Sequence, residues 1–282
     1  MAYDKPFKTY NEQITKLQND YGLMINDIEF AKHALISISY YDLVNGYKST
    51  LMENGKFKPG LSIKYLYELY LLDKSIQAFI MKYSLFIENM FKNLLAYSIA
   101  SSFGVDETKY LDTNNYQSYN SGISFKDNVL SEILPLLTNT TKCKMPTKHY
   151  KENHNHIPPW ILFKNISFGD AINLFCVLNR QEKEPITDIL FENAPGKDQK
   201  QPLNIDKAAC KGLYSTILMI LLFLKTPYLK ALFITEFKNT IFNNPTDEQN
   251  QLRRSLFSDY CKLTSLPSNI LDRLSKFQQT LS

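Results

Sequence analysis

Apolar residues recur at intervals of three and four along most of the chain, which is the spacing of one face of an α-helix. The longest such block runs from Ser62 to Phe103 and predicts one long helix or two abutting helices, with Gly104 as a natural stop. Glycine is scarce, and strict alternation of apolar and polar residues is rare. The pattern therefore predicts an all-α fold, arranged as a helical bundle.

Two shorter helices are expected ahead of this block. Thr9 is placed to cap a helix that continues to Asn19, with Gly22 ending it, and Asp27 is placed to start a second helix. A cluster of three tyrosines follows, at positions 40, 41 and 47, and Gly46 closes the unit. We interpret the cluster as core and loop packing rather than as a platform for stacking bases.

The rest of the chain predicts further helices separated by polar segments. In order, we expect a polar loop at 106–122, a helix at 126–137, a basic connector at 141–157, helical spacing at 160–178 with Ser167 as a cap, an exposed excursion at 192–202, an apolar helix at 205–224 broken or kinked by Pro227, and terminal helices at 247–263 and 268–281.

Composition narrows the class of protein only a little. A formal charge of +4 does not by itself demand a polyanionic partner, so any nucleic-acid interpretation depends on local patches. The four cysteines lie more than thirty residues apart, unlike zinc or redox motifs. The first ten residues have no leader pattern, and the longest apolar stretch, Leu213–Leu224, is far below the roughly 20 residues that cross a bilayer. We expect a soluble cytoplasmic protein.

The basic connector is the densest patch of positive charge. Together with Trp160 it offers groups that can bind phosphates and stack a base, namely Lys142, Lys144, Lys148, His149 and Lys151. The alternative is a solvated loop ahead of the Pro158-Pro159 break. A metal site at His149, His154 and His156 is not favoured, because the segment lacks a fourth ligand. Glycine-rich phosphate loops and Ser-His-Asp order are also missing, so no cofactor is expected.

Four strings in order carry a resemblance to a known family. They are Tyr10-Asn11-Glu12-Gln13-Ile14, then Ser39-Tyr40-Tyr41-Asp42-Leu43 with Gly46 and Tyr47, then Leu69-Tyr70 and Asp73 followed by Ile87-Glu88 and Lys92, and finally Pro158-Pro159-Trp160 with Ser167-Phe168-Gly169. With these strings the chain resembles the bacterial Abi-like abortive-infection proteins of the AbiD/AbiF group, which confer resistance to bacteriophage. The resemblance covers nearly the whole chain.

The resemblance implies a helical HEPN-like domain, frequently a metal-independent ribonuclease that acts as a homodimer and halts the host cell after phage infection. Some relatives are encoded beside a structured non-coding RNA that restrains them. On this basis we expect a single domain over residues 1–282, with an N-terminal helical subregion at 1–60 and a HEPN-like core at 61–282. A phage-derived trigger is a further expected partner.

The catalytic motif that the resemblance implies is missing. HEPN ribonucleases use an Arg followed after four to six residues by a His, which supply a fixed cation and a group that titrates near neutral pH. The chain has four histidines, and none lies beyond residue 156. At the expected location Lys225 and Lys230 stand at the Arg and His spacing, and a second match over 192–197 lacks the preceding apolar helix. Lysine replaces His as an acid or base only if burial lowers its pKa strongly.

Glu88 is the third candidate catalytic residue, because the resemblance implies that it faces the motif helix. Lys92, one turn later, is a candidate RNA-binding residue. The alternative is an ordinary i, i+4 salt bridge on a helix surface.

Three functions remain open at this point. The leading one is an RNA-binding defence protein whose HEPN motif is degenerate. The others are an active endoribonuclease toxin restrained by a non-coding RNA, and a non-enzymatic module that senses a phage protein.

Overall fold

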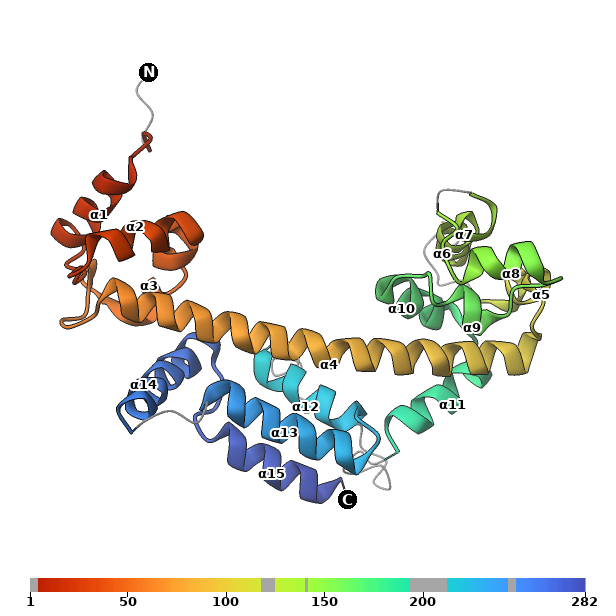
Figure 1. Ribbon diagram of the computed structural model, residues 1–282. Coiled ribbons are helices and arrows are strands. Elements are labelled where there is room, and N and C mark those ends of the chain that lie inside the picture. The colour runs from red at the N-terminus through yellow and green to blue at the C-terminus, as the bar shows by residue number, and fades with distance from the viewer. Residues whose placement is uncertain (1–4, 118–124, 140–141, 193–211, 243–246, 282) are drawn as a thin grey trace.

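One long helix runs through the centre of the molecule (Figure 1). The computed structural model describes residues 5–117, 125–139, 142–192, 212–242 and 247–281. Helix α4 (Ile63–Phe103) has 41 residues and is therefore about 60 Å long. The Ser62 hydroxyl accepts a hydrogen bond from the Tyr65 amide at 3.2 Å, and Gly104 ends the helix with φ +86°. The block predicted from the sequence is thus a single helix, with the predicted stop.

The first lobe stands over the N-terminal end of α4 (Figure 1). It consists of α1 (Tyr10–Asn19), α2 (Ile28–Ser37), a π-helical turn η1 (Tyr41–Asn45), α3 (Lys48–Leu51) and an antiparallel hairpin of β1 (Met52–Glu53) and β2 (Lys56–Phe57). Thr9 and Asp27 cap α1 and α2 as predicted, Thr9 through a capping box with Glu12. The hairpin and the π-turn were not expected from the sequence.

The second lobe lies over the other end of α4, on the same side as the first (Figure 1). Its elements are α5 (Glu107–Tyr110), the 3-10 turn η2 (Thr113–Asn115), α6 (Phe125–Ile133), α7 (Pro135–Thr138), α8 (Thr147–Asn153), α9 (Pro159–Leu162) and α10 (Phe168–Val177). Helix α11 (Arg180–Leu190) follows on the opposite side of α4.

Two expectations for this lobe were wrong. The segment at 106–122 is not simply a polar loop, because its described part contains α5 and η2 and buries Tyr110 and Tyr116. The connector at 141–157 is not a loop either, since α8 occupies its middle. Ser167 caps α10 as predicted, although that helix starts two residues earlier than the expected Asp170. The sequence pattern did not reveal α11.

Four helices lie along the opposite side of α4 from the two lobes (Figure 1). They are α12 (Leu213–Phe223), α13 (Pro227–Ile241), α14 (Asp247–Thr264) and α15 (Ile270–Thr280). Both terminal helices were predicted. Pro227 ends no helix here; it occupies the first turn of α13, a position that tolerates proline because its missing N–H would have no partner in the helix. The expected excursion at 192–202 lies outside the described residues, apart from Glu192.

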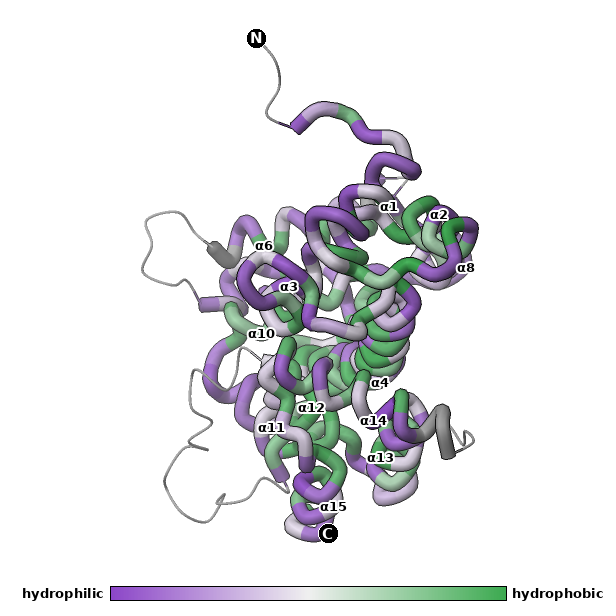
Figure 2. Tube along the Cα trace, turned by 90° about the vertical axis from the view of Figure 1, so that its left-hand side faces the viewer, coloured by the Kyte–Doolittle hydropathy of each residue, from purple (hydrophilic) through white to green (hydrophobic). Residues whose placement is uncertain are grey.

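The buried side chains form two clusters that meet on α4. The first cluster joins the N-terminal lobe, α4 as far as Ile87, and α12 to α15, while the second joins α4 from Phe91 onward with α5 to α11. Phe191 and Phe223 contact both clusters, and their rings meet edge to face at 5.5 Å. Figure 2 shows the apolar character of α4 and α12, which are packed together. The all-α fold is confirmed, whereas the HEPN-like core and the division at residue 60 stay predictions.

Across the described residues, no helix combines the length and apolar character needed to cross a membrane. Cys143 and Cys261 are buried free thiols and Cys176 is half-buried. Cys210 lies outside the described residues.

Candidate functional site

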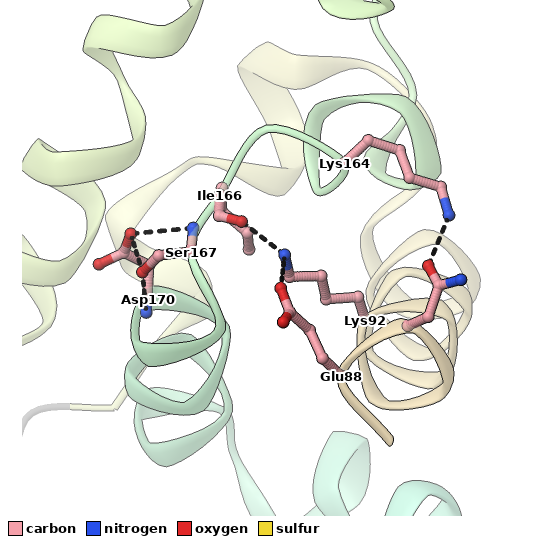
Figure 3. A network of polar contacts seen from close by, with 7 residues as sticks. Glu88, Lys92, Lys164, Ile166, Ser167 and Asp170 are labelled. Carbon is pink, nitrogen blue, oxygen red and sulfur yellow. Dashed lines mark hydrogen bonds and ion pairs between the residues drawn. The ribbon is translucent and has the colours of Figure 1, made fainter. Parts of the chain in front are cut away.

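Two of the strings that carry the family resemblance meet through a buried lysine. Lys92 on α4 is only 8% exposed, and its ammonium donates hydrogen bonds of 2.6 Å to the Glu88 carboxylate and 2.6 Å to the Ile166 carbonyl (Figure 3). Ile166 directly precedes the Ser-Phe-Gly string. The interpretation of Glu88 and Lys92 as an ordinary surface pair is therefore wrong: the pair fastens α4 to the loop before α10. We call it the α4 clamp.

The Ser-Phe-Gly string forms the start of α10 and docks it on α4. The Ser167 hydroxyl accepts from the Asp170 amide at 3.0 Å, and the Asp170 carboxylate accepts in return from the Ser167 amide and hydroxyl (Figure 3). The Phe168 ring meets Phe91 edge to face at 5.8 Å. The string thus has a structural explanation that needs no ligand.

A cavity of about 740 Å³ lies where the two buried clusters meet. We call it the junction pocket. It is lined by Phe86, Ile87, Asn89, Met90, Asn93, Leu94, Tyr97, Ile189, Phe223, Leu224, Lys225, Thr226 and Leu229, which come from α4, α11, α12, α13 and the turn between the last two. A largely apolar pocket with a few polar groups at the meeting of two cores is a common setting for ligand sites. Sequence reasoning anticipated only Lys225 among these residues.

The two candidate motif lysines have different surroundings. Lys225 lines the junction pocket, and its ammonium donates to the Leu190 carbonyl at 2.9 Å. Lys230, on α13, is 5% exposed and its ammonium lies 3.5 Å from the Leu281 carbonyl. Burial lowers the pKa of Lys230 from its ordinary value. Glu88 belongs to the α4 clamp and does not line the junction pocket.

The predicted RNA-binding residues of the connector lie on and around α8. We call the group of Lys142, Lys144, Lys148, His149, Lys151 and Trp160 the α8 surface. Lys142, Lys144, Lys148 and His149 are exposed, and Trp160 at the start of α9 is 45% exposed. Lys148 lies 3.9 Å from Glu152, but both side chains are more than half exposed, so water screens the pair. Lys151 donates to the Leu137 carbonyl.

Buried hydrogen bonds fix this segment to the rest of the second lobe. Thr147 is fully buried, and the Asn165 amide donates both to its hydroxyl and to the Lys144 carbonyl, the latter at 3.0 Å. The Tyr110 hydroxyl donates to the Ile157 carbonyl at 2.6 Å. The backbone that carries the lysines is therefore held in place while their side chains extend into solvent. Lys92, the remaining predicted RNA-binding residue, belongs to the α4 clamp instead.

Two other sites considered from the sequence were a metal site at the histidines of the connector and a second catalytic-motif match at 192–197. Within the described ranges, no group of three or more His, Cys, Asp or Glu side chains is placed to hold a metal ion. His154 instead stacks on Tyr150, with ring centroids 4.4 Å apart. The match at 192–197 falls outside the described residues beyond Glu192.

Comparison with the sequence models of known families gives a match. The sequence model of a family described as Abi-like protein matches residues 33–217, which is more than half of the chain. The matched range includes the α4 clamp and the α8 surface but ends before Lys225 and Lys230. No curated protein and no solved structure gives a match to the chain.

Proposed function

The chain belongs to the Abi-like protein family, and from that premise we propose that it acts in abortive infection by binding RNA on the α8 surface. Family membership supports the defence role at the coarse level. The specific proposal adds the ligand, which is a target RNA or a restraining non-coding RNA, and the place where it binds.

The observation that carries the proposal is a set of exposed lysines on a fixed scaffold beside an exposed indole. Lys142, Lys144 and Lys148 present their ammonium groups to solvent, and within the described residues their only ion pair is the solvent-screened one between Lys148 and Glu152. Such groups bind phosphates by releasing condensed counterions. Trp160 supplies an exposed aromatic face, which is how proteins commonly hold an unpaired RNA base.

We further propose that the HEPN-like motif is degenerate and serves binding at most. The two candidate lysines donate to backbone carbonyls of different segments, Lys225 to Leu190 and Lys230 to Leu281. An ammonium engaged in this way acts as a structural donor or a point charge, whereas the reaction needs a group that exchanges a proton near neutral pH. The homodimer and a phage-derived trigger remain part of the proposal. The mass of the purified protein in solution tests the dimer.

The test measures RNA affinity over a range of salt concentrations. We expect the wild-type protein to lose affinity steeply between about 50 and 200 mM salt, and the double variant Lys144→Glu/Lys148→Glu to bind at least about tenfold more weakly with a salt slope smaller by about 2. The double variant Lys238→Glu/Lys276→Glu, on α13 and α15, is the matched control, since it makes the same charge change at two other exposed lysines. If the control loses as much RNA affinity as the Lys144→Glu/Lys148→Glu variant, the loss comes from net charge alone, and the proposal that RNA binds on the α8 surface is refuted.

One observation favours the nuclease as a second candidate. The pKa of Lys230 is lowered by burial, which is the direction that acid or base chemistry by lysine needs. Incubation of RNA with the protein in EDTA, beside Lys230→Met, separates the two functions. Metal-independent cleavage by the wild type that disappears in the variant supports the nuclease, and absence of cleavage by the wild type supports the binding function.

A further inference from the structure

A second pocket lies in the N-terminal lobe, at the other end of α4 from the α8 surface. We call it the N-terminal pocket. Its volume is about 520 Å³, within the range that suits a small ligand. The described residues that line it are Lys5, Pro6, Lys8, Gln13, Lys16, Tyr21, Tyr40, Tyr41, Asn45 and Lys48. None of them is acidic, and three of them are tyrosines.

The positive charge in this pocket is only partly balanced in the described part of the chain. No ion pair engages any of its four lysines there, although the Glu12 carboxylate lies close enough to Lys8 for the two charges to interact. The Glu12 carboxylate, which belongs to the same helix as Lys16, is occupied by the Thr9 amide and hydroxyl at 2.7 Å each. Lys16 and Lys48 both approach the Tyr21 ring, at 5.6 and 5.4 Å from its centroid. Lysines gathered without a carboxylate repel one another, and an anion bound among them relieves that repulsion.

Two polar atoms at the pocket are shielded from solvent. The Asn45 side-chain oxygen has no hydrogen-bond partner among the described residues, and the Tyr40 hydroxyl has only the Tyr21 side chain beside it. Burial raises the pKa of Tyr40 to about 12, with a smaller effect of the nearby Tyr21, so its hydroxyl stays a donor at neutral pH. Such unpaired groups are rare and call for a ligand or water as partner.

One of these two shielded atoms can donate a hydrogen bond and the other can only accept one, which limits the kinds of ligand that fit both. The Tyr40 hydroxyl can donate to a phosphate oxygen, while the Asn45 oxygen needs a donor such as a ribose hydroxyl or an N–H group. Tyr41 is 71% exposed and leaves an aromatic face for a base. Tyr41 and Asn45 begin and end the π-turn η1, a kind of turn that is frequent at functional sites.

We propose that the N-terminal pocket binds a nucleotide, meaning one nucleoside with its phosphate, supplied either as a free nucleotide or as the 5′-phosphorylated end of an RNA. In this proposal the lysines bind the phosphate, a task that a glycine-rich loop performs in many other nucleotide-binding proteins. This site is separate from the α8 surface, so either proposal can fail without the other.

The test is calorimetric titration of the purified full chain with AMP and ATP. We expect saturable binding with a Kd below about 1 mM. Tyr40→Phe should weaken it about tenfold, because one hydrogen bond to a charged group is lost. Lys16→Gln/Lys48→Gln should weaken it at least as much. Lys56→Gln, an exposed lysine of the same lobe outside the pocket, should bind like the wild type.

Tyr40→Phe also separates a ligand role from a structural one. Within the described residues its hydroxyl makes no close hydrogen bond and interacts only weakly with the Tyr21 side chain, so the variant should unfold at nearly the same temperature as the wild type. Wild-type protein that binds neither nucleotide, or a Tyr40→Phe protein that binds both as tightly as wild type, overturns the proposal. Equal affinity for inorganic tripolyphosphate and ATP overturns the nucleoside part.

Two short RNAs distinguish the sources of the nucleotide. A hexamer with a 5′-phosphate and the same hexamer with a 5′-hydroxyl are titrated into Lys144→Glu/Lys148→Glu, so that the α8 surface contributes little. Tighter binding of the phosphorylated hexamer than of AMP identifies an RNA end as the ligand. Binding of AMP with no difference between the hexamers identifies a free nucleotide.

Discussion

Lys92 and Glu88 lie one turn apart on α4 and form an ion pair, with 2.6 Å between the ammonium nitrogen and the nearer carboxylate oxygen. The two side chains are unequally buried, since that of Lys92 is 9% exposed and that of Glu88 is 28% exposed. The Ile166 carbonyl completes the surroundings of the ammonium. A charge in such a position is tolerated only while its partners remain, because desolvation of an unpaired ion costs several kcal/mol.

Removal of the Lys92 ammonium should therefore destabilise the fold. We expect Lys92→Met, which keeps the length of the side chain, to lower the free energy of unfolding by about 2–4 kcal/mol, because the Glu88 carboxylate and the Ile166 carbonyl lose their donor. Urea denaturation measures the difference. Lys164→Met is the control, since the Lys164 side chain is exposed and its ammonium donates to the Asn89 side chain at 3.1 Å. The effect of this variant should stay within about 0.5 kcal/mol. Similar values for both variants would contradict the clamp.

Gly46 is required by a close approach of backbone atoms. A Cβ at this position would lie 2.7 Å from the Asp42 carbonyl oxygen, inside the π-turn that positions Tyr41 and Asn45. Gly46→Ala should lower the free energy of unfolding by about 1–3 kcal/mol and weaken nucleotide binding as well. Gly169→Ala is the matched control, because its Cβ would meet only the Ser167 hydroxyl at 3.6 Å and alanine favours the helix. A thermal shift assay measures the unfolding temperatures. Equal temperatures for the two variants would contradict the steric explanation at Gly46.

The contact of Glu236 with α4 makes stability depend on pH. Lys82 lies 2.7 Å from the Glu236 carboxylate and the Tyr83 hydroxyl donates to it at 2.9 Å; these bonds, that of Lys82 first, hold the pKa of Glu236 below its ordinary value. The stabilisation is therefore fully present above the pKa of the unfolded state and is lost as the pH falls through the lower pKa of the folded state.

The matching experiment compares wild type and Glu236→Gln across the acidic range. The wild type should be the more stable above about pH 5, and the difference should shrink toward about pH 3. Urea midpoints at several pH values measure it. A difference that does not change with pH would mean that the carboxylate charge is not the cause.

Local signals explain what the sequence predicted well. Helix starts at Thr9, Asp27 and Ser167 depend on a hydroxyl or carboxylate that bonds an amide three residues later, and such signals lie within one turn of chain. Helix α4 was predictable because its apolar stripe continues without a break. By contrast, α8 depends on distant anchors such as Asn165, whose contact with Thr147 no spacing rule reveals.

The sites were harder to predict than the helices for the same reason. Lys92 was predicted to bind RNA, with an ordinary surface pair as the alternative, because its i, i+4 spacing from Glu88 does not reveal that the loop carrying Ile166 covers it. The N-terminal pocket combines Lys16 of α1 with Lys48 of α3 and the tyrosines between them. The tyrosine cluster was interpreted as packing, which is correct for the buried Tyr47 but not for the exposed Tyr41. The sequence did not show that this cluster lies beside lysines that form no ion pair within the described residues.

Trp160 is the only tryptophan of the chain and reports on the α8 surface. If RNA stacks there, its bases should quench the indole fluorescence in a saturable way, whereas AMP in the N-terminal pocket should leave it unchanged, because that pocket lies at the opposite end of α4 (Figure 1). Trp160→Ala should weaken RNA binding by about 1–3 kcal/mol, and Trp160→Phe, which retains a ring, by less. RNA that binds by anisotropy without changing the tryptophan signal would have to contact another part of the molecule.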